Sequence, residues 1–245
     1  MPVGENDDFG EISHSKDGYD SGGIYDSRYD TTLTDDECIN WGYFRAHIDL
    51  FYDMGEYGVI YTDKRSPYYV LKIANCDVTN GESNWMMADF LLENWRRNIE
   101  GLVDITCVYV GTCDAFHKEL IMKISRATKD PAVLQKARNV LDLDESDEIL
   151  MVRMEKLPYL GLTHPDLSRE EMIDRVASAA YNISIQTGMY LDDLKPANFG
   201  FRKDGSAAIF DFNLEAFFKI FHPLIRFAPS PLLLEEYRKK ITDAS

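Results

Sequence analysis

Cysteine is scarce in this chain, whose 245 residues include only Cys38, Cys76, Cys107 and Cys113. The last two are the only ones that lie close together, and they have neither a metal-finger spacing nor a matching second pair. The sequence therefore predicts free thiols and no zinc finger.

Long apolar runs are also missing. No apolar stretch reaches the ~18 to 20 residues that a membrane-spanning helix needs. The N-terminus has neither the basic start nor the apolar run of a secretory signal. We therefore expect a soluble, cytoplasmic protein without a transmembrane segment.

Positive charge is in deficit. The chain has 26 Lys and Arg against 42 Asp and Glu, which gives a formal net charge of -16. Nucleic-acid phosphates require a clustered positive surface, and no such cluster is visible in the sequence. The charge therefore argues against a nucleic-acid partner.

The excess of negative charge is concentrated at the start of the chain. Residues 1–37 hold eleven acidic residues against Lys16 and Arg28, a net charge of -9, which leaves -7 for the other 208 residues. Few residues of this stretch are large and apolar, so it cannot bury enough surface to offset the entropy of ordering. We expect residues 1–35 to be a disordered acidic leader.

Strand-like and helix-like patterns follow this leader. Apolar residues make up 45% of the chain, as is typical of a globular protein. We expect two lobes of one folded unit, 36–157 and 158–245. The patterns predict, in order, a short helix leading into a strand (39–52), a turn and a second strand (55–61), a strand (68–73), a helix (82–102), a strand (105–110), a strand (119–124), a helix (132–140), a strand (149–154), a helix (168–188) and a hairpin (199–210).

The strongest chemical signal begins at Asp193, in the run Asp-Leu-Lys-Pro-Ala-Asn, and continues with an Asp-Phe-Asn run that starts at Asp211. In protein kinases an Asp accepts the proton of the substrate hydroxyl and an Asn holds a magnesium ion. The Asp of a D-F-G run holds the metal that bridges the ATP phosphates. The same residue types occur here in the same order, and on this basis the chain resembles the protein kinase-like superfamily.

The resemblance implies a fold, two cofactors and a role for each residue. The fold would be α+β and two-lobed, with a small antiparallel β lobe carrying one helix and a reduced, mainly helical large lobe. The cofactors would be ATP and Mg2+. Asp193 would be the catalytic base, and Lys195 would neutralise charge on the transferring phosphoryl group. Asn198 and Asp211 would hold the metal.

A glycine loop and a lysine extend the resemblance. Gly55, Tyr57 and Gly58 match the second half of the kinase glycine-rich pattern, while Asp53 stands where the first glycine would fall. Glycines let backbone N–H groups approach phosphates closely, and Tyr57 would shield the site from water. Lys72 lies in Val-Leu-Lys-Ile, which resembles the V-A-I-K strand, so its implied role is to contact the α- and β-phosphates.

The lysine of such a strand pairs with a glutamate of the following helix. Glu93 lies at a suitable distance along the sequence, although Arg97 stands four residues later where an apolar residue is expected. Glu82 is the competing choice. Either glutamate would equally serve as a solvated charge on the helix face.

The family fold also has a hinge that joins its two lobes. The strand-like run that ends in Met154-Glu155-Lys-Leu157 has the expected form. Glu155 and Leu157 are therefore expected to contact the nucleotide. Ile124-Ser125 is the competing hinge.

Three departures from the family pattern concern the segments that regulate kinase activity. Asp192 stands where arginine is typical, Asn213 replaces the glycine of D-F-G, and only 32 residues follow Asn213. The missing arginine argues against switching by loop phosphorylation. The apolar residues of 217–227 and 231–241 are expected to pack under the catalytic loop in place of missing helices. Substrate recognition must then come from elsewhere.

The sequence thus predicts phosphate transfer from ATP to Ser or Thr of a protein substrate, by a minimal kinase without a regulatory activation segment. Such a protein resembles the compact kinases of bacteriophages, viruses or secreted bacterial effectors, which act in a host cytoplasm. A protein substrate or an activating protein partner is expected. Three alternatives stay open: a nucleotide-binding scaffold without transfer activity, a small-molecule kinase, and transfer of AMP instead of phosphate.

Overall fold

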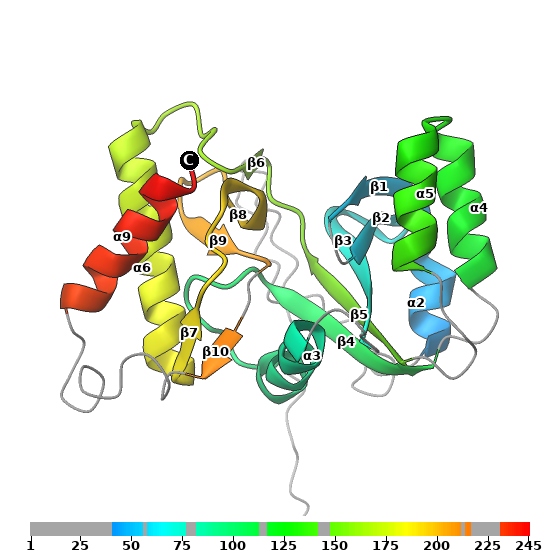
Figure 1. Cartoon of the computed structure of the whole chain (residues 1–245), viewed down its shortest axis with the longest axis horizontal. Helices are drawn as coiled ribbons and strands as arrows, with labels where there is room; N and C mark the ends of the chain where they lie inside the picture. Colours follow the sequence, from blue (N-terminus) through cyan, green and yellow to red (C-terminus); the bar gives the residue numbers. More distant parts are fainter. Residues whose placement is uncertain are drawn as a thin grey trace, which may run out of the picture. The chain divides into compact units, whose positions relative to one another are not determined.

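The computed structural model describes residues 41–55, 58–76, 82–112, 117–141, 148–211, 214–216 and 231–245. In these ranges the protein has an α+β fold with a five-stranded antiparallel sheet (Figure 1). Some of the sequence predictions concern residues outside this description: the leader at 1–35, Tyr57, Asn213 and the aromatic stretch 217–227.

The five strands of the main sheet are those predicted at the corresponding places in the sequence. They are β1 (Ile48–Met54), β2 (Gly58–Asp63), β3 (Ser66–Asn75), β4 (Ile105–Thr112) and β5 (Glu148–Glu155). Their order in the sheet is β1-β2-β3-β5-β4, and every neighbouring pair is antiparallel. Half of the residues of β3 and most residues of β5 are buried, because these strands lie inside the sheet and both of its faces are covered.

Successive residues of β3 enter two different cores, since side chains alternate between the faces of a strand. Leu71 and Ile73 pack in a core that α2 (Trp41–His47), α4 (His117–Ala127) and α5 (Pro131–Val140) cover. Val70 packs in the other core, which contains residues of α3 (Glu82–Asn94). Figure 1 shows α2, α4 and α5 grouped together, away from α3.

The prediction of a strand at 119–124 is wrong, because this segment forms part of helix α4. Leu120 and Ile124 are fully buried, and residues four apart lie on the same face of a helix. The segment contains three apolar residues in a row, which fit either a short strand or a buried helical turn. The competing hinge at Ile124-Ser125 is excluded, since both residues lie inside α4.

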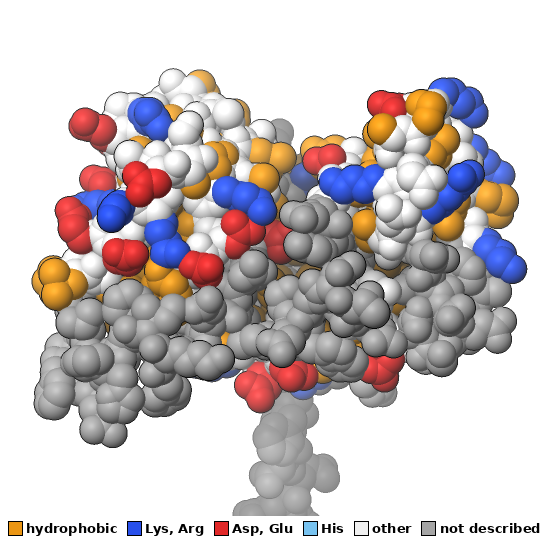
Figure 2. All heavy atoms as spheres, in the orientation of Figure 1, with side chains coloured by type: hydrophobic (Ala, Val, Ile, Leu, Met, Phe, Trp, Pro, Cys, Tyr) orange, Lys and Arg blue, Asp and Glu red, His pale blue; other side chains and the backbone are white. Residues whose placement is uncertain are grey.

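Helix α5 confirms the helix predicted at 132–140. Its N-terminus is capped by Asp130, whose carboxylate accepts a hydrogen bond from the N–H of Ala132 at 2.8 Å. Residues 117–141 contain six Lys and Arg but two acidic residues. Figure 2 shows basic side chains gathered over α4 and α5, so folding concentrates positive charge on one part of an acidic chain.

Helix α3 confirms a helix after β3 but ends at Asn94, earlier than the predicted 82–102. The side-chain amide of Asn94 donates to the carbonyl of Phe90 at 2.8 Å, and its oxygen accepts from Arg97 Nη1 at 2.7 Å. Asparagine side chains that bond nearby groups in this way compete with continued helix.

Helix α6 (Arg169–Thr187) confirms the helix predicted from Ser168 to Gly188. Ser168 Oγ accepts from the N–H of Glu171, and the Glu171 carboxylate accepts from the N–H of Ser168 at 2.8 Å. This reciprocal capping box lowers the pKa of Glu171, chiefly through the hydrogen bond from the Ser168 hydroxyl. Gly188 ends the helix with a φ of 71°, a left-handed conformation that glycine adopts at little cost.

The remaining strands are short and surround the loop that follows α6. They are β6 (Tyr159–Leu160), β7 (Met189–Leu191), β8 (Phe199–Phe201), β9 (Ala207–Ile209) and β10 (Leu214–Ala216), with the 3-10 turn η3 at Pro196–Asn198. β6, β8 and β9 form one sheet, and β7 pairs with β10. The hairpin predicted at 199–210 is confirmed as β8 and β9, and Gly205 in its turn has a φ of 81°.

The last described element, α9 (Pro231–Asp243), packs along α6 (Figure 1). Its buried residues Leu233, Tyr237 and Ile241 are four apart and belong to the same core as Val70. None of the described helices is long and apolar enough to cross a membrane. Cys76 and Cys107 are buried, while the other two cysteines lie outside the described residues.

Candidate functional site

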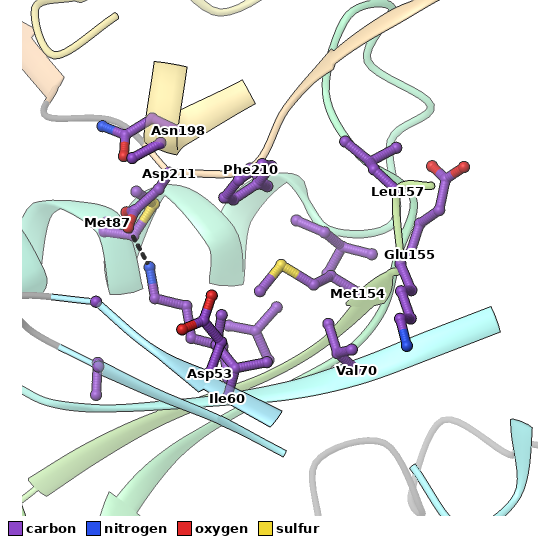
Figure 3. Close-up of a pocket in the computed structure, with 18 of the residues that line it drawn as sticks. Asp53, Ile60, Val70, Met87, Met154, Glu155, Leu157, Asn198, Phe210 and Asp211 are labelled. Atoms are coloured by element: carbon purple, nitrogen blue, oxygen red, sulfur yellow. Dashed lines mark ion pairs between the residues drawn. The ribbon is translucent and has the colours of Figure 1, made fainter. Parts of the chain in front are cut away.

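A cavity of about 330 Å³ lies between the main sheet and the segment that runs from Asp193 to Asp211. Its apolar wall includes Ile60, Val70, Met154, Leu157 and Phe210. Lys72, Asn198 and Asp211 also line it, together with Asp193 and Lys195. Figure 3 shows Asn198 and Asp211 at one end of the cavity, called the polar end below, and Leu157 with Glu155 at the other.

Lys72 joins the sheet to the loop segment at the polar end. It lies on β3 opposite Ile60 of β2 and Val152 of β5, and all three line the cavity. Its Nζ forms an ion pair with Asp211 Oδ2 at 2.8 Å (Figure 3). The lysine side chain is only 16% exposed, so its ammonium is held in place beside the cavity.

The glycine loop leaves room for this lysine. A Cβ added to Gly58 would lie 3.1 Å from Lys72 Cε and 3.1 Å from the carbonyl oxygen of Ile73. The N–H of Gly55 donates to the carbonyl of Gly58 at 2.9 Å, so the two predicted glycines close one turn. Both glycines line the cavity, as does the exposed residue Asp53.

Asp193, Lys195 and Asn198 form one polar cluster. Lys195 Nζ lies 2.8 Å from Asp193 Oδ2. The buried Asn198 donates from its side-chain nitrogen to Asp193 Oδ2 and to the Asp193 carbonyl, each at 2.9 Å. These bonds fix the carboxylate of Asp193 at the cavity wall and engage the nitrogen of the Asn198 amide, not its oxygen.

The backbone connects this cluster to Asp211. The carbonyl of Asn198 accepts hydrogen bonds from the N–H groups of Phe210 at 3.0 Å and Asp211 at 3.2 Å. In the β8–β9 hairpin, Phe199 is paired with Ile209, which brings the two ends of the hairpin together. The predicted effect of the hairpin, to hold Asn198 and Asp211 close together, is confirmed.

Among the predicted site residues that the structure describes, Glu93 alone does not line the cavity. It is exposed on α3, whereas the ion pair of Lys72 is with Asp211. The side chain of the competing residue, Glu82, lies outside the description.

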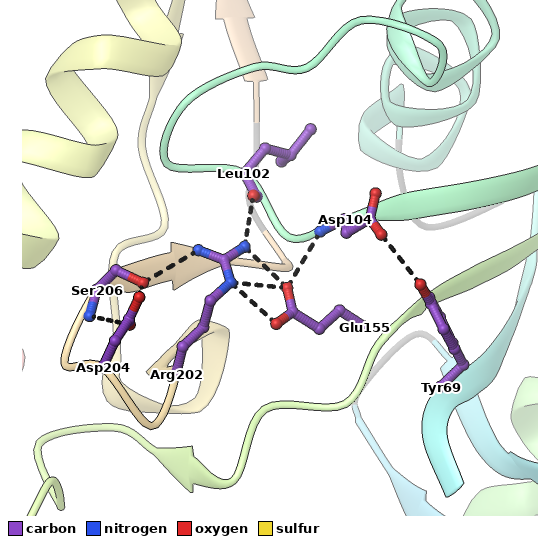
Figure 4. Close-up of polar contacts among 7 residues, drawn as sticks. All are labelled: Tyr69, Leu102, Asp104, Glu155, Arg202, Asp204 and Ser206. Atoms are coloured by element: carbon purple, nitrogen blue, oxygen red, sulfur yellow. Dashed lines mark hydrogen bonds and ion pairs between the residues drawn. The ribbon is translucent and has the colours of Figure 1, made fainter. Parts of the chain in front are cut away.

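Glu155 and Leu157 line the cavity where β5 ends, at the position predicted for the hinge. The carboxylate of Glu155 accepts from Arg202 of β8–β9 at 2.8 to 3.0 Å through three hydrogen bonds, and from the N–H of Asp104 at 3.3 Å (Figure 4). Arg202 also donates to the carbonyl of Leu102 at 3.3 Å. No local sequence pattern predicts this network, because Glu155 and Arg202 are 47 positions apart.

Sequence reasoning also missed two residues of α9 that contact the segment before Asp193. Lys240 forms an ion pair with Asp192, and the hydroxyl of Tyr237 accepts from the N–H of Leu191 at 3.2 Å. The apolar spacing of 231–241 predicted packing in this region. It carried no signal for the polar contacts, which join residues 46 and 48 positions apart.

The donor set at the polar end is compatible with magnesium. Among the described residues, no group of three or more His, Cys, Asp or Glu could hold a metal by itself. Magnesium in nucleotide sites instead uses one or two protein oxygen ligands together with phosphates and water. The Asp211 carboxylate and the Asn198 amide oxygen supply ligands of this type beside a lysine that can meet phosphate.

Comparison of the chain with protein-family models gave no match, and comparison with curated proteins gave none either. The cavity and its side chains are therefore the basis on which a function can be assigned.

Proposed function

We propose that this protein is an ATP- and magnesium-dependent phosphotransferase with a reduced, two-lobed protein kinase-like fold, which phosphorylates Ser or Thr of protein substrates. The observation that carries the proposal is the convergence of two polar pairs on one cavity. Lys72 pairs with Asp211 at 2.8 Å, and Asn198 holds Asp193 at 2.9 Å. These residues come from β3 and from a loop more than 100 residues later.

The apolar wall of the cavity suits the base of a nucleotide. Ile60, Val70 and Leu157 contribute aliphatic side chains to the wall of the cavity, and Phe210 adds an aromatic one. Binding sites for cofactors are typically apolar with a few convergent polar groups. The phosphates of a nucleotide placed in this way extend toward Lys72 and the turn at Gly58.

Asp193 is the residue proposed to act on the hydroxyl of the substrate. Its carboxylate orients the hydroxyl and accepts its proton as the oxygen forms a bond to the γ-phosphorus. The bond between the γ-phosphorus and the bridging oxygen of the β-phosphate breaks in the same transfer, and ADP leaves. Asn198 and Lys195 fix the position of this carboxylate. Lys195 also offers positive charge to the phosphoryl group during transfer. Magnesium, when bound by Asn198 and Asp211, would neutralise negative charge on the ATP phosphates.

A nucleotide-binding scaffold without transfer activity is the second candidate, and two observations favour it. The carboxylate of Asp53 lines the cavity where a glycine N–H would meet phosphate in the family pattern. Glu93 is exposed, so Lys72 has Asp211 as its ion-pair partner and not the predicted helix glutamate. Both features would weaken binding of the nucleotide phosphates.

The test is incubation of the protein with magnesium and γ-labelled ATP, alone and with a cell lysate. We expect labelled protein with the wild type and a loss of at least about 100-fold with Asp193→Asn, because a positioned base contributes about that factor or more. Asp166→Asn is the matched control, since this exposed carboxylate lies outside the cavity lining. It should leave transfer unchanged.

Other results would reject the proposal in favour of a named alternative. Nucleotide binding with no transfer by the wild type would indicate a scaffold. Label on a metabolite panel but on no protein would indicate a small-molecule kinase. Retention of an α-phosphate label, without the γ-phosphate, would indicate transfer of AMP.

A further inference from the structure

Helix α9 contacts three consecutive residues, and these three directly precede Asp193. Tyr237 stacks on Tyr190, with ring centroids 5.4 Å apart and an interplanar angle of 16°. The Tyr237 hydroxyl accepts a hydrogen bond from the N–H of Leu191 at 3.2 Å. Lys240 forms an ion pair with Asp192. The last described helix of the chain is thus attached to the start of the loop that carries the proposed base.

Tyr237 is a fixed attachment point. Its side chain is fully buried, and its hydroxyl also shares a hydrogen bond of 2.5 Å with Ser184 of α6. Burial raises the pKa of Tyr237, so the hydroxyl stays protonated at neutral pH. A single hydroxyl therefore joins α6, α9 and the backbone of β7.

Lys240 brings a positive charge to Asp192, the residue that stands where arginine is typical of the kinase pattern. Its Nζ contacts the Asp192 carboxylate, lies 3.4 Å from the Asp192 carbonyl oxygen and stands 5.2 Å from the centre of the Tyr190 ring. Partial burial acts to lower the pKa of Lys240, but hydrogen bonds with Asp192 and Tyr190 raise it overall. The lysine is therefore charged across the physiological pH range.

We propose that α9 is a positioning element of the active site, in which Tyr237 and Lys240 fix the backbone at 190–192 and thereby place Asp193. This inference rests on the proposed function of Asp193 as catalytic base. β7 has only three residues, so its pairing with β10 gives few anchors of its own. Because a displacement of about 1 Å costs up to about 100-fold in rate, anchoring next to the base has a direct kinetic consequence.

The kinetic test compares Tyr237→Phe and Lys240→Met with the wild type. Each variant removes one polar contact and keeps the bulk of the side chain. We expect kcat to fall about 10-fold in each, with KM for ATP unchanged within about twofold, because the loop and not the nucleotide site is altered. Lys240→Arg should recover most of the rate, since it restores the charge.

Arg238→Met is the matched control. Arg238 lies on the same helix and pairs with Asp174 of α6 at 2.9 Å, so it holds α9 in the fold without touching 190–192. It should leave kcat unchanged. Equal losses of kcat in Arg238→Met and Lys240→Met would overturn the proposal, because α9 would then act only through general stability. Unchanged kcat in both Tyr237→Phe and Lys240→Met would overturn it as well.

Amide hydrogen exchange separates this inference from the proposed function, since it needs no transfer activity. In Tyr237→Phe, the N–H of Leu191 and its neighbours should exchange faster than in the wild type, while amides of α3 should not change. Unchanged exchange at 189–194 would refute the anchoring by α9. If exchange increases but the wild type transfers no phosphate, the anchoring stands and the proposed function fails.

Discussion

Under the proposed function, Lys72 is the residue expected to contribute most to nucleotide binding. It is the cation of the ion pair with Asp211, and its Cε lies 3.1 Å from the position that a Cβ on Gly58 would occupy. If nucleotide and magnesium bind as proposed, the phosphates would compete with Asp211 for Lys72, and the metal would compete with Lys72 for Asp211. The pair thus keeps an ammonium and a carboxylate at the polar end of the cavity before ligand arrives.

Replacing Lys72 by Met should weaken binding of an ATP analogue about 10- to 100-fold, the expected value of a charge-assisted contact to phosphate. Adenosine, which has no phosphates, should lose little affinity. Titration calorimetry with both ligands measures the difference. Lys64→Met is the control, because this exposed lysine lies in the turn between β2 and β3. Equal weakening of ATP analogue and adenosine would contradict the role of Lys72.

At the residue scale, the sequence was informative wherever a short motif carried the chemistry. Asp193, Lys195 and Asn198 lie within six positions, so their proximity follows from local geometry alone. Glu93 was predicted to contact the nucleotide site but does not line the cavity, because the direction in which a helix face points depends on how the helix packs. Its spacing from Lys72 in the sequence contains no such information.

At the scale of single elements, α6 shows how local rules position the site. Its capping box at Ser168 and its left-handed Gly188 determine where the helix begins and ends. The end of α6 in turn determines where β7 starts, and β7 leads directly into the loop of Asp193. The helix was predictable because all of these signals lie next to each other in the sequence.

Ser168→Ala should reduce the free energy of unfolding by about 1 kcal/mol, the usual loss for an N-cap serine. Glu171 has a lowered pKa, so its contribution is present above its ordinary value of 4.5 and is lost as pH falls through the lower folded value. The penalty of Ser168→Ala should therefore be smaller at pH 3 than at pH 7. Urea unfolding at the two pH values measures this.

Ser178→Ala is the control for the capping prediction, because Ser178 is an exposed residue in the interior of the same helix. Its hydroxyl donates to the carbonyl of Asp174, a contact that competes weakly with the helix, so the change should cost little. A Ser178→Ala loss as large as that of Ser168→Ala would show that the capping box has no special role.

The error at α4 marks the limit of sequence patterns for an element. Three apolar residues in a row fit a strand as well as a helix. The spacing of Leu120 and Ile124 identifies a helix only once it is known that both side chains pack in the same core. Tertiary packing against β1 and β2 determines that this segment is a helix, and no local sequence rule describes that packing.

At the scale of the whole molecule, Arg202 connects the end of β5 to the β8–β9 hairpin. Its guanidinium contacts the Glu155 carboxylate and the Leu102 carbonyl, and both Glu155 and Leu102 line the cavity. This network and the contacts of Lys240 join distant parts of the chain. They depend on topology, which is why the sequence predicted the elements and the motif residues but none of these polar contacts.

Arg202→Met should lower the free energy of unfolding by about 1 to 3 kcal/mol, because it leaves the partly buried carboxylate of Glu155 without its main donor. Urea unfolding measures the loss. Lys203→Met, one residue further along and exposed, should change stability by less than about 0.5 kcal/mol. The additional loss from Glu155→Gln should be smaller in the Arg202→Met background than alone, since the two residues share one interaction. Full additivity would contradict the coupling.

A crystal structure of the protein with a non-hydrolysable ATP analogue and magnesium tests most directly whether this cavity binds nucleotide as proposed. We expect the base to lie against Ile60 and Val70, the phosphates to contact Lys72, and the metal to be bound by Asn198 and Asp211. The terminal phosphate should face Asp193. A nucleotide bound outside this cavity, or one whose phosphates touch neither Lys72 nor a metal held by Asn198 and Asp211, would contradict it.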